Sequence, residues 1–133
     1  MISIEDFAKV EIKVGKILSA EKIPDTDKLL KFSVDFGMKE VVETEAVADA
    51  GAAPVPPIVT KVPDVRQIVS GISLYYPDPL VLVGKKCMFV TNLEPRKIKG
   101  FDSNGMLFAL STPDGKFSIL EPNSDIPEGT KAK

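Results

Sequence analysis

The sequence predicts an all-β domain, a closed or nearly closed barrel of short strands. Several runs alternate apolar and polar residues, which is typical of strands that bury one face. No segment carries a long repeat near 3.6 residues, the period of an amphipathic helix. Clusters of Gly, Pro, Asn and Asp separate the runs, and short strands punctuated in this way favour a barrel.

The N-terminal part predicts a helical turn followed by two strands. Ser3 is placed to cap a short turn that runs through Phe7. The first strand alternates roughly between apolar and charged residues, at Val10, Ile12, Val14 and Ile17 against Glu11, Lys13 and Lys16. From Leu30 to Phe36 every second residue is apolar, so we expect Lys31 on the face opposite the core.

The C-terminal half adds β-prone runs and one helical stretch. The runs are Arg66–Ile72, Lys86–Thr91, Met106–Leu110 and Phe117–Leu120. Asp114 and Gly115 predict a tight hairpin between the last two runs. The prolines of Tyr75–Leu82 limit that segment to about one turn of helix before Gly84.

Residues Met38–Val65 differ in composition from the rest of the chain. They hold four prolines, a cluster of alanines and no aromatic residue, so we expect a mobile insertion between the second and third strands. Val41-Val42 and Ile58-Val59 could pair and extend the hairpin, but the proline-rich tip from Ala50 onward cannot hold a regular ladder. We interpret the segment as a tolerated surface insertion, with a loop for a specific partner as the alternative.

Length and composition indicate one domain that spans residues 1–133. At 133 residues and 44% hydrophobic, the chain is long enough for one packed core and too short for two ordinary domains. At Met1 it shows no leader in which charged residues precede an apolar stretch, and it contains no apolar run of about 18 residues. We therefore expect neither secretion nor a membrane span. We therefore expect a cytoplasmic protein.

The residue types that most catalysis needs are missing. The chain has no histidine and one cysteine, so a zinc site or a nucleophile–base relay lacks its usual residues. Cys87 lies in an apolar run, where we expect a buried, unreactive thiol. Asp25 and Asp27 lie in a turn after Pro24, which local side-chain hydrogen bonds explain. We predict no catalytic residue, metal site, cofactor or enzyme activity.

The most informative segment is Asn92–Met106, which reads N-L-E-P-R-K-I-K-G-F-D-S-N-G-M. It places Arg96, Lys97 and Lys99 on an exposed connection between two apolar runs, with no carboxylate among them. A fixed group of cations suits a polyanion, because it displaces counterions from phosphates. The alternative is a solvated loop that keeps the protein in solution.

The net charge of −2, from 17 basic and 19 acidic residues, is not the strongly positive charge that is typical of a general nucleic-acid binder. Its distribution matters more than its sum. Without residues 38–65 the chain holds 15 basic and 14 acidic residues. Salt screens charges over roughly 8 to 10 Å, so a local patch that adds Lys28, Lys31 and Arg66 to the cations of Asn92–Met106 can still attract phosphate.

Six further motifs complete a family pattern in the right order. They are F-A-K-V-E-I-K-V-G-K-I at Phe7–Ile17, P-D-T-D-K-L-L at Pro24–Leu30, V-D-F-G at Val34–Gly37, R-Q-I-V-S-G-I at Arg66–Ile72, V-G-K at Val83–Lys85 and P-D-G-K-F-S-I-L-E-P at Pro113–Pro122. Together with Asn92–Met106, they resemble the tRNA-binding domain family, which includes the C-terminal domain of bacterial methionyl-tRNA synthetase and stand-alone homologues. The resemblance implies an OB-fold, a Greek-key barrel. Met38–Val65 departs from it, because the family usually has a short turn there.

The resemblance also implies a function. Such domains bind the folded body of tRNA with tolerance for sequence, as an accessory to aminoacylation. The family motif assigns Asn92, Arg96, Lys97 and Ser103 to the RNA surface, with Met106 beside them. With the neighbouring cations, the candidate RNA-binding residues are Lys28, Lys31, Arg66, Asn92, Arg96, Lys97, Lys99, Ser103 and Met106. Phe101 or Met106 could touch bases, although we expect Met106 to be buried.

The tail bears on partners. Lys116–Lys131 resembles the ending that helps to build homodimers of synthetase-type domains, so we expect a homodimer that buries Ile119, Leu120 and Ile126 or their neighbours. The expected ligand is tRNA, and a methionyl-tRNA synthetase is a further candidate partner. The alternative function is a dimeric, export-related chaperone-like module that binds proteins.

Overall fold

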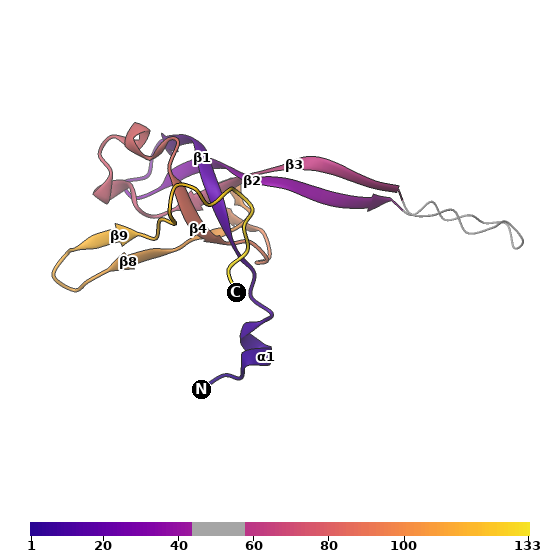
Figure 1. Cartoon of the computed structure of the whole chain (residues 1–133). Helices are drawn as coiled ribbons and strands as arrows, with labels where there is room; N and C mark the ends of the chain where they lie inside the picture. Colours follow the sequence, from indigo (N-terminus) through magenta and orange to yellow (C-terminus); the bar gives the residue numbers. More distant parts are fainter. Residues whose placement is uncertain (44–57) are drawn as a thin grey trace, which may run out of the picture.

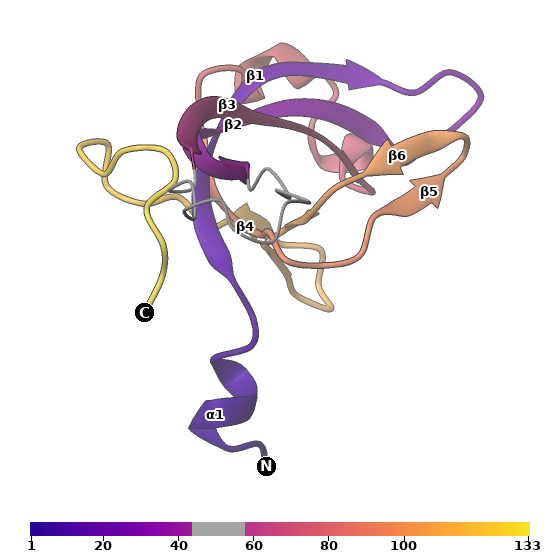
Figure 2. The same cartoon turned by 90° about the vertical axis from the view of Figure 1, so that its right-hand side faces the viewer.

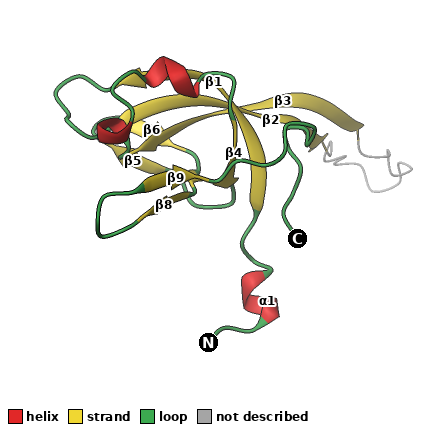
Figure 3. Cartoon of the chain, turned by 60° about the vertical axis from the view of Figure 1, so that its left-hand side comes forward, coloured by secondary structure: helices red, strands yellow, loops and turns green. Residues whose placement is uncertain are grey.

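The computed structural model of the chain describes residues 1–43 and 58–133 (Figure 1). A five-stranded antiparallel sheet with the order β3-β2-β1-β4-β7 forms the centre of the fold. The strands are β1 (Ile12–Lys22), β2 (Leu30–Glu43), β3 (Ile58–Ser70), β4 (Lys86–Val90) and β7 (Met106–Leu107). The sheet curls into a half-barrel, and short helical segments accompany it (Figure 3). The predicted all-β class is confirmed.

Alternation along β1 and β2 explains how these strands build the core. Ile17 of β1 lies opposite Val34 of β2, and both side chains are fully buried. The alternate residues of β2 that enter the core are Leu30, Phe32, Val34 and Phe36. Lys31 lies between two of them and is only half-buried, as predicted for the opposite face. β1 begins at Ile12 and continues to Lys22, so it lies further along the chain than the predicted alternation.

β1 passes close to the core at Gly15. A Cβ atom there would lie 2.5 Å from Val34 Cγ1, 2.7 Å from Phe36 Cε1 and 2.9 Å from Phe89 Cδ2. The Phe36 and Phe89 rings meet edge to face, with centroids 5.4 Å apart. Because this packing leaves no room for a side chain, the position requires glycine.

Hydrogen bonds between β3 and residues 102–104 join the two sides of the curled sheet. The Asn104 N–H donates to the Gln67 carbonyl at 2.9 Å, and Gln67 Nε2 donates to the Asp102 carbonyl at 2.9 Å. The Val69 N–H donates to Ser103 Oγ at 3.0 Å. These bonds link the outer edge of β3 to the segment that leads into β7, so the barrel is nearly closed.

β2 and β3 continue beyond the barrel as a two-stranded ribbon (Figure 1). Their register shifts between Asp35 and Met38, at the point where the ribbon leaves the barrel. Gly37 has a φ of 81° there, and Asp35 Oδ1 accepts its N–H at 2.8 Å. Such an irregularity bends a strand pair and increases its twist.

Pairing in the ribbon resumes with Met38 opposite Pro63 and ends with Glu43 opposite Ile58. Val41-Val42 and Ile58-Val59 therefore pair as an extension of the hairpin, which confirms that prediction. The proline-rich tip lies within residues 44–57, outside the described residues. The mobility of the expected insertion stays a prediction.

The helical segments are short. α1 (Ile4–Phe7) follows Ser3, whose Oγ accepts the Asp6 N–H at 3.2 Å, so the predicted cap is confirmed. η1 (Ser73–Tyr75) and η2 (Pro79–Leu82) are the 3-10 turns that a proline-rich segment allows. Within the described ranges, no helix has the length and apolar character needed to cross a membrane.

A separate hairpin follows β7. β8 (Ala109–Ser111) pairs with β9 (Phe117–Ile119), and Asp114 and Gly115 lie in the connection as predicted. The predicted strand Met106–Leu110 is interrupted at Phe108, whose N–H donates to the Met88 carbonyl at 3.1 Å. One predicted strand is therefore divided between the barrel and the β8–β9 hairpin.

The C-terminal tail runs beside the first residues of β1. These residues precede the part of β1 that pairs with β2. The Val14 carbonyl accepts the Gly129 N–H at 2.8 Å, and the Val14 N–H donates to the Thr130 carbonyl at 2.9 Å. Lys86 Nζ donates to the Ser124 and Ile126 carbonyls at 3.0 and 2.9 Å. The tail is thus an integral part of the fold.

Candidate nucleic-acid interface

The cation-bearing segment contains a β-hairpin at one side of the barrel (Figure 2). β5 (Arg96–Ile98) pairs with β6 (Phe101–Ser103) in antiparallel register. Lys99 and Gly100 form the turn with φ values of 50° and 85°, and two positive φ values are typical of a type I′ turn. The predicted exposure of Arg96, Lys97 and Lys99 is confirmed, and the connection that carries them contains a paired hairpin that was not predicted from the sequence.

The hairpin separates the three cations. Residues opposite each other in the ladder share a face, so Arg96 and Ile98 lie on the same side as Ser103. Lys97 and its partner Asp102 lie on the other side, and Lys99 lies at the turn. The expected cluster therefore presents its charges in three directions.

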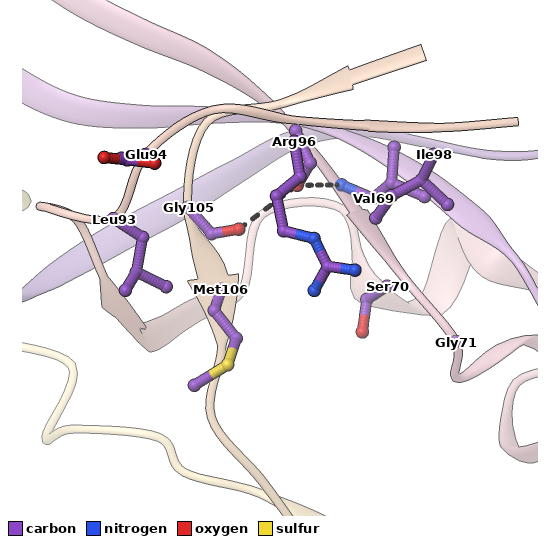
Figure 4. A pocket seen from close by; sticks show the side chains of 10 residues that line it. Val69, Ser70, Gly71, Leu93, Glu94, Arg96, Ile98, Gly105 and Met106 are labelled. Atoms are coloured by element: carbon purple, nitrogen blue, oxygen red, sulfur yellow. Dashed lines mark hydrogen bonds between the residues drawn. The ribbon is translucent and has the colours of Figure 1, made fainter. Parts of the chain in front are cut away.

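Arg96 extends into a groove of about 240 Å³ between the hairpin, the end of β3 and the start of β7 (Figure 4). This Arg96 groove is lined by Val69, Ser70, Gly71, Leu93, Glu94, Arg96, Ile98, Ser103, Gly105 and Met106. Met106 is 47% exposed, which corrects the expectation that it is buried. Within the described ranges, Arg96 makes no ion pair, so its charge is available to a ligand.

A second groove, of about 450 Å³, joins the hairpin turn to the Asp25–Leu29 turn. Lys28 and Lys99 both line this turn groove, together with Ile98. Asp25 and Asp27 also belong to its wall, so its charge is mixed. The turn predicted there is confirmed, because Thr26 Oγ1 donates to the Ile23 carbonyl at 2.8 Å.

Lys31 reaches the hairpin from β2. Its Nζ lies 5.0 Å from the centre of the Phe101 ring and 3.5 Å from Glu21 Oε2. The first contact is a cation–π interaction, and the second partly neutralises the lysine. Lys31 is therefore near the candidate site, with less free charge than the hairpin cations.

Two expected RNA-binding residues use their polar atoms inside the protein. Ser103 is buried, and its Oγ accepts the Val69 N–H and donates to the Gly105 carbonyl at 3.1 Å. Asn92 Oδ1 accepts the Glu11 N–H at 2.8 Å, and its Nδ2 donates to the Lys9 carbonyl. Both side chains hold the hairpin segment on the barrel.

Arg66 is also engaged within the protein. Its Nε and Nη2 donate to the two carboxylate oxygens of Asp64 at 3.0 and 3.1 Å. The guanidinium carbon lies 5.3 Å from the centre of the Phe36 ring. The structure therefore groups Lys28, Lys31, Arg96, Lys97, Lys99 and Met106 at the hairpin and its grooves, and places Arg66, Asn92 and Ser103 in internal contacts.

The family model described as "Putative tRNA binding domain" matches residues 40–131 of this chain. The chain belongs to the tRNA-binding domain family. The methionine–tRNA ligase of Methanospirillum hungatei is 42% identical to this tRNA-binding domain over 132 residues, which are 99% of the domain and 16% of the ligase. That of Enterococcus faecalis is 37% identical over 128 residues, 96% of the domain and 16% of the ligase. The chain thus spans about a sixth of the length of these relatives.

Solved structures agree with this assignment. The MetRS related protein from Pyrococcus horikoshii is 33% identical to the tRNA-binding domain, with a TM-score of 0.75 over 100% of this chain and 98% of that one. The chaperone CsaA from Bacillus anthracis is 24% identical, with a TM-score of 0.72 over 100% of this chain and 99% of the chaperone. At that identity, the likeness to the chaperone shows the fold alone.

Sequence reasoning missed part of the wall of the Arg96 groove in this tRNA-binding domain. Leu93 and Glu94 were visible as neighbours of the cations, but nothing in the sequence shows which way they point. Ser70 and Gly71 lie at and just after the end of β3 and face the hairpin only because the barrel closes. Their position in the motif Arg66–Ile72 was the one available signal.

The thiol of the tRNA-binding domain is buried, as predicted. Burial raises the pKa of Cys87 to about 12, so the thiol stays protonated near neutral pH. Among the residues that the structure describes, no group of three or more His, Cys, Asp or Glu side chains could hold a metal ion.

Proposed function

We propose that this domain binds the phosphate backbone of folded tRNA, with tolerance for sequence, as a non-catalytic accessory to aminoacylation. The observation that carries the proposal is Arg96, a guanidinium in an open groove with no ion-pair partner in the described part of the chain. A guanidinium can hold a phosphate through two parallel hydrogen bonds. Membership of the family supports tRNA as the source of that phosphate.

Other side chains extend the proposed contact. Lys97 on the opposite face of the hairpin, and Lys28 and Lys99 at the turn groove, act as point charges for further phosphates. Leu93 and Met106 offer apolar surface to sugars or base edges in the Arg96 groove. Phosphate contacts set orientation and carry no sequence information, so the shape of the RNA directs binding.

Fluorescence anisotropy with labelled, unmodified tRNA at two salt concentrations tests the proposal. Each phosphate contact contributes about −0.7 to −0.9 to the slope of log affinity against log salt, so about three to five contacts make binding clearly salt-sensitive. Lys61→Ala, which removes an exposed lysine of the ribbon, is the control and should bind like the parent. Absence of binding at low salt would reject the proposal.

We also propose that the domain serves a methionyl-tRNA synthetase catalytic region in the cytoplasm, within one chain or as a separate partner. The support is that the relatives of which it spans 16% are methionine–tRNA ligases. Adding the domain to the catalytic region should lower KM for tRNA and leave kcat nearly unchanged, because it adds binding and no chemistry. An unchanged KM would count against this role.

For assembly we propose a homodimer whose contact surface differs from the one expected from the sequence. Ile119 already belongs to the core of the monomer, so a second copy cannot bury it. Leu120 is 37% exposed, and η1, η2 and β8 expose further apolar side chains at Leu74, Tyr75, Leu80, Val81 and Leu110. Tyr75 stacks on Phe117 with ring centroids 4.1 Å apart, which joins η1 to β9.

Light scattering tests the homodimer. The dimer has about twice the 14.4 kDa mass of one chain. Leu120→Ser together with Leu110→Ser should shift the mass toward that of the monomer. In an isologous contact each substituted leucine is lost from both copies of the chain. A monomer mass for the parent across micromolar concentrations would contradict the dimer.

The leucine variants, together with Arg96→Ala, separate tRNA binding from the chaperone-like alternative. A protein-binding module would depend on the exposed apolar side chains and would be indifferent to Arg96. A tRNA-binding module depends on Arg96. Tight tRNA binding by Arg96→Ala, combined with loss of client protein binding in the leucine variants, would favour the alternative.

A further inference from the structure

We propose that the Arg66–Asp64 pair is a clamp that positions the tRNA-binding hairpin, so that Arg66 is a positioning residue and makes no phosphate contact. The inference rests on the proposed function of that hairpin. Arg66 Nη1 donates to the Thr91 carbonyl at 2.5 Å and to the Asn104 carbonyl at 3.4 Å. These carbonyls stand at the two ends of residues 92–103, which contain the whole β5–β6 hairpin. One nitrogen atom therefore ties the point where the hairpin leaves the barrel to the point where it returns.

Asp64 fixes the guanidinium in this position. Its carboxylate occupies Nε and Nη2, which leaves Nη1 for the two carbonyls. Asp64 is 3% exposed, and an aspartate buried so deeply requires a paired cation. Lys39 Nζ also approaches Asp64 Oδ1, at 4.0 Å, from the exposed ribbon.

The remaining attachments each hold one end of the segment, and at its start Asn92 bonds to Glu11 and Lys9. Gln67 and Val69 of β3 bind the backbone and side chain of β6, at Asp102 and Ser103. On the other side, residues 93–95 make no hydrogen bond to the barrel within the described ranges. In that part of the chain, no side chain other than Arg66 is hydrogen-bonded to both ends of the segment.

A clamp and a direct phosphate contact predict opposite effects for Asp64→Asn. If Arg66 bound phosphate, loss of the carboxylate would free the guanidinium and reduce the repulsion of RNA, so tRNA binding would tighten. If Arg66 is a clamp, loss of the carboxylate releases the guanidinium and loosens the hairpin, so tRNA binding weakens. The substitution changes the net charge by the same amount under both hypotheses, so the direction of the change in tRNA affinity distinguishes them.

The experiment compares Asp64→Asn and Arg66→Lys with a control on the exposed ribbon, Glu40→Gln, which removes the same negative charge as Asp64→Asn. Arg66→Lys keeps the charge and loses the fork that reaches both Asp64 and the carbonyls. We expect tRNA affinity to fall about fivefold or more in the first two variants and to change less than about twofold in the control. Hydrogen exchange at the hairpin amides, measured without RNA, should accelerate in the first two variants and stay unchanged in the control.

Unchanged or tighter tRNA binding by Asp64→Asn, together with parent-like exchange in the hairpin, would overturn the clamp. If Asp64→Asn does not fold, Arg66→Lys decides through the same two measurements. Failure of the parent protein to bind tRNA would reject the proposed function instead. In that case the exchange measurement would still decide whether the clamp exists.

Discussion

The side chains of Arg96 and Lys97 are adjacent in sequence and lie on opposite faces of the β5–β6 hairpin. Arg96 shares its face with the buried Ser103 and lines the Arg96 groove. Lys97 shares its face with the exposed Asp102, a carboxylate that weakens its attraction for phosphate. If the hairpin binds tRNA as proposed, we therefore expect the two cations to meet different phosphates and to contribute unequally.

Arg96→Ala should weaken tRNA binding by about 1.5 kcal/mol or more, because it removes a charge-assisted contact with two hydrogen bonds. Lys97→Ala should cost less, about 0.5 kcal/mol, because it removes an exposed point charge. The double variant should also flatten the salt dependence. Anisotropy titrations measure the affinities, and circular dichroism verifies folding. A folded double variant that binds as tightly as the parent would remove the hairpin as the site.

Gly15→Ala should lower the free energy of unfolding by about 1 to 3 kcal/mol, because the added methyl group overpacks the core. Its Cβ would lie within 3 Å of Val34, Phe36 and Phe89. Gly71→Ala is the matched control, since a Cβ there meets nothing within 4 Å. Its stability should stay within about 0.5 kcal/mol of the parent. Urea unfolding measures both variants, and equal stability would show that β1 moves aside without cost.

Cys87 should be inert in the folded protein. Its pKa of about 12 leaves little thiolate, the reactive form, at about pH 8. The side chain is also fully buried, so a reagent cannot reach it without local unfolding. A thiol reagent should therefore label the native protein slowly and the denatured protein quickly. Fast labelling of the native state would show that β4 opens readily.

Glu11 gives the stability a small dependence on pH. Thr91 Oγ1 donates to Glu11 Oε1 at 2.7 Å, and this bond lowers the pKa of Glu11 below its ordinary 4.5, with Lys13 at 3.3 Å adding to the effect. A lowered pKa means that the ionised carboxylate favours the folded state. Its contribution is therefore present above about pH 4.5 and is lost as the pH falls through the folded-state pKa.

Glu11→Gln should be less stable than the parent near neutral pH by no more than about 1 kcal/mol, because the pair is partly exposed and screened by water. The difference between the two proteins should shrink in acid. Thermal unfolding at neutral and acidic pH measures it. A difference that widens as the pH falls would mean that the protonated carboxyl is the stabilising form.

Local patterns predict the parts of the fold that depend on near neighbours. The alternation of Leu30–Phe36 and the cap at Ser3 need no information from elsewhere in the chain. The β5–β6 hairpin does not follow from such patterns. Each of its strands has three residues, and its turn places Lys99 in the left-handed region, where a lysine is unusual.

Distant contacts decide how the candidate site residues are used. The carbonyls that accept from Arg66 lie 25 and 38 residues away, and Asn92 donates to a carbonyl 83 residues away. Residue type marks these polar side chains as candidates for RNA contact. Whether their polar atoms already form hydrogen bonds within the protein depends on the three-dimensional arrangement. That arrangement cannot be inferred from one sequence.

The bonds that fasten the hairpin to β3 join Gln67 to Asp102 and Val69 to Ser103, over 35 and 34 residues of chain. Contacts over such separations carry the entropic cost of closing a long loop and form slowly. A chain that has not closed its barrel therefore has no positioned Arg96. If the domain holds tRNA through Arg96 as proposed, binding therefore requires that the barrel has closed, and a partly folded chain should not bind tRNA.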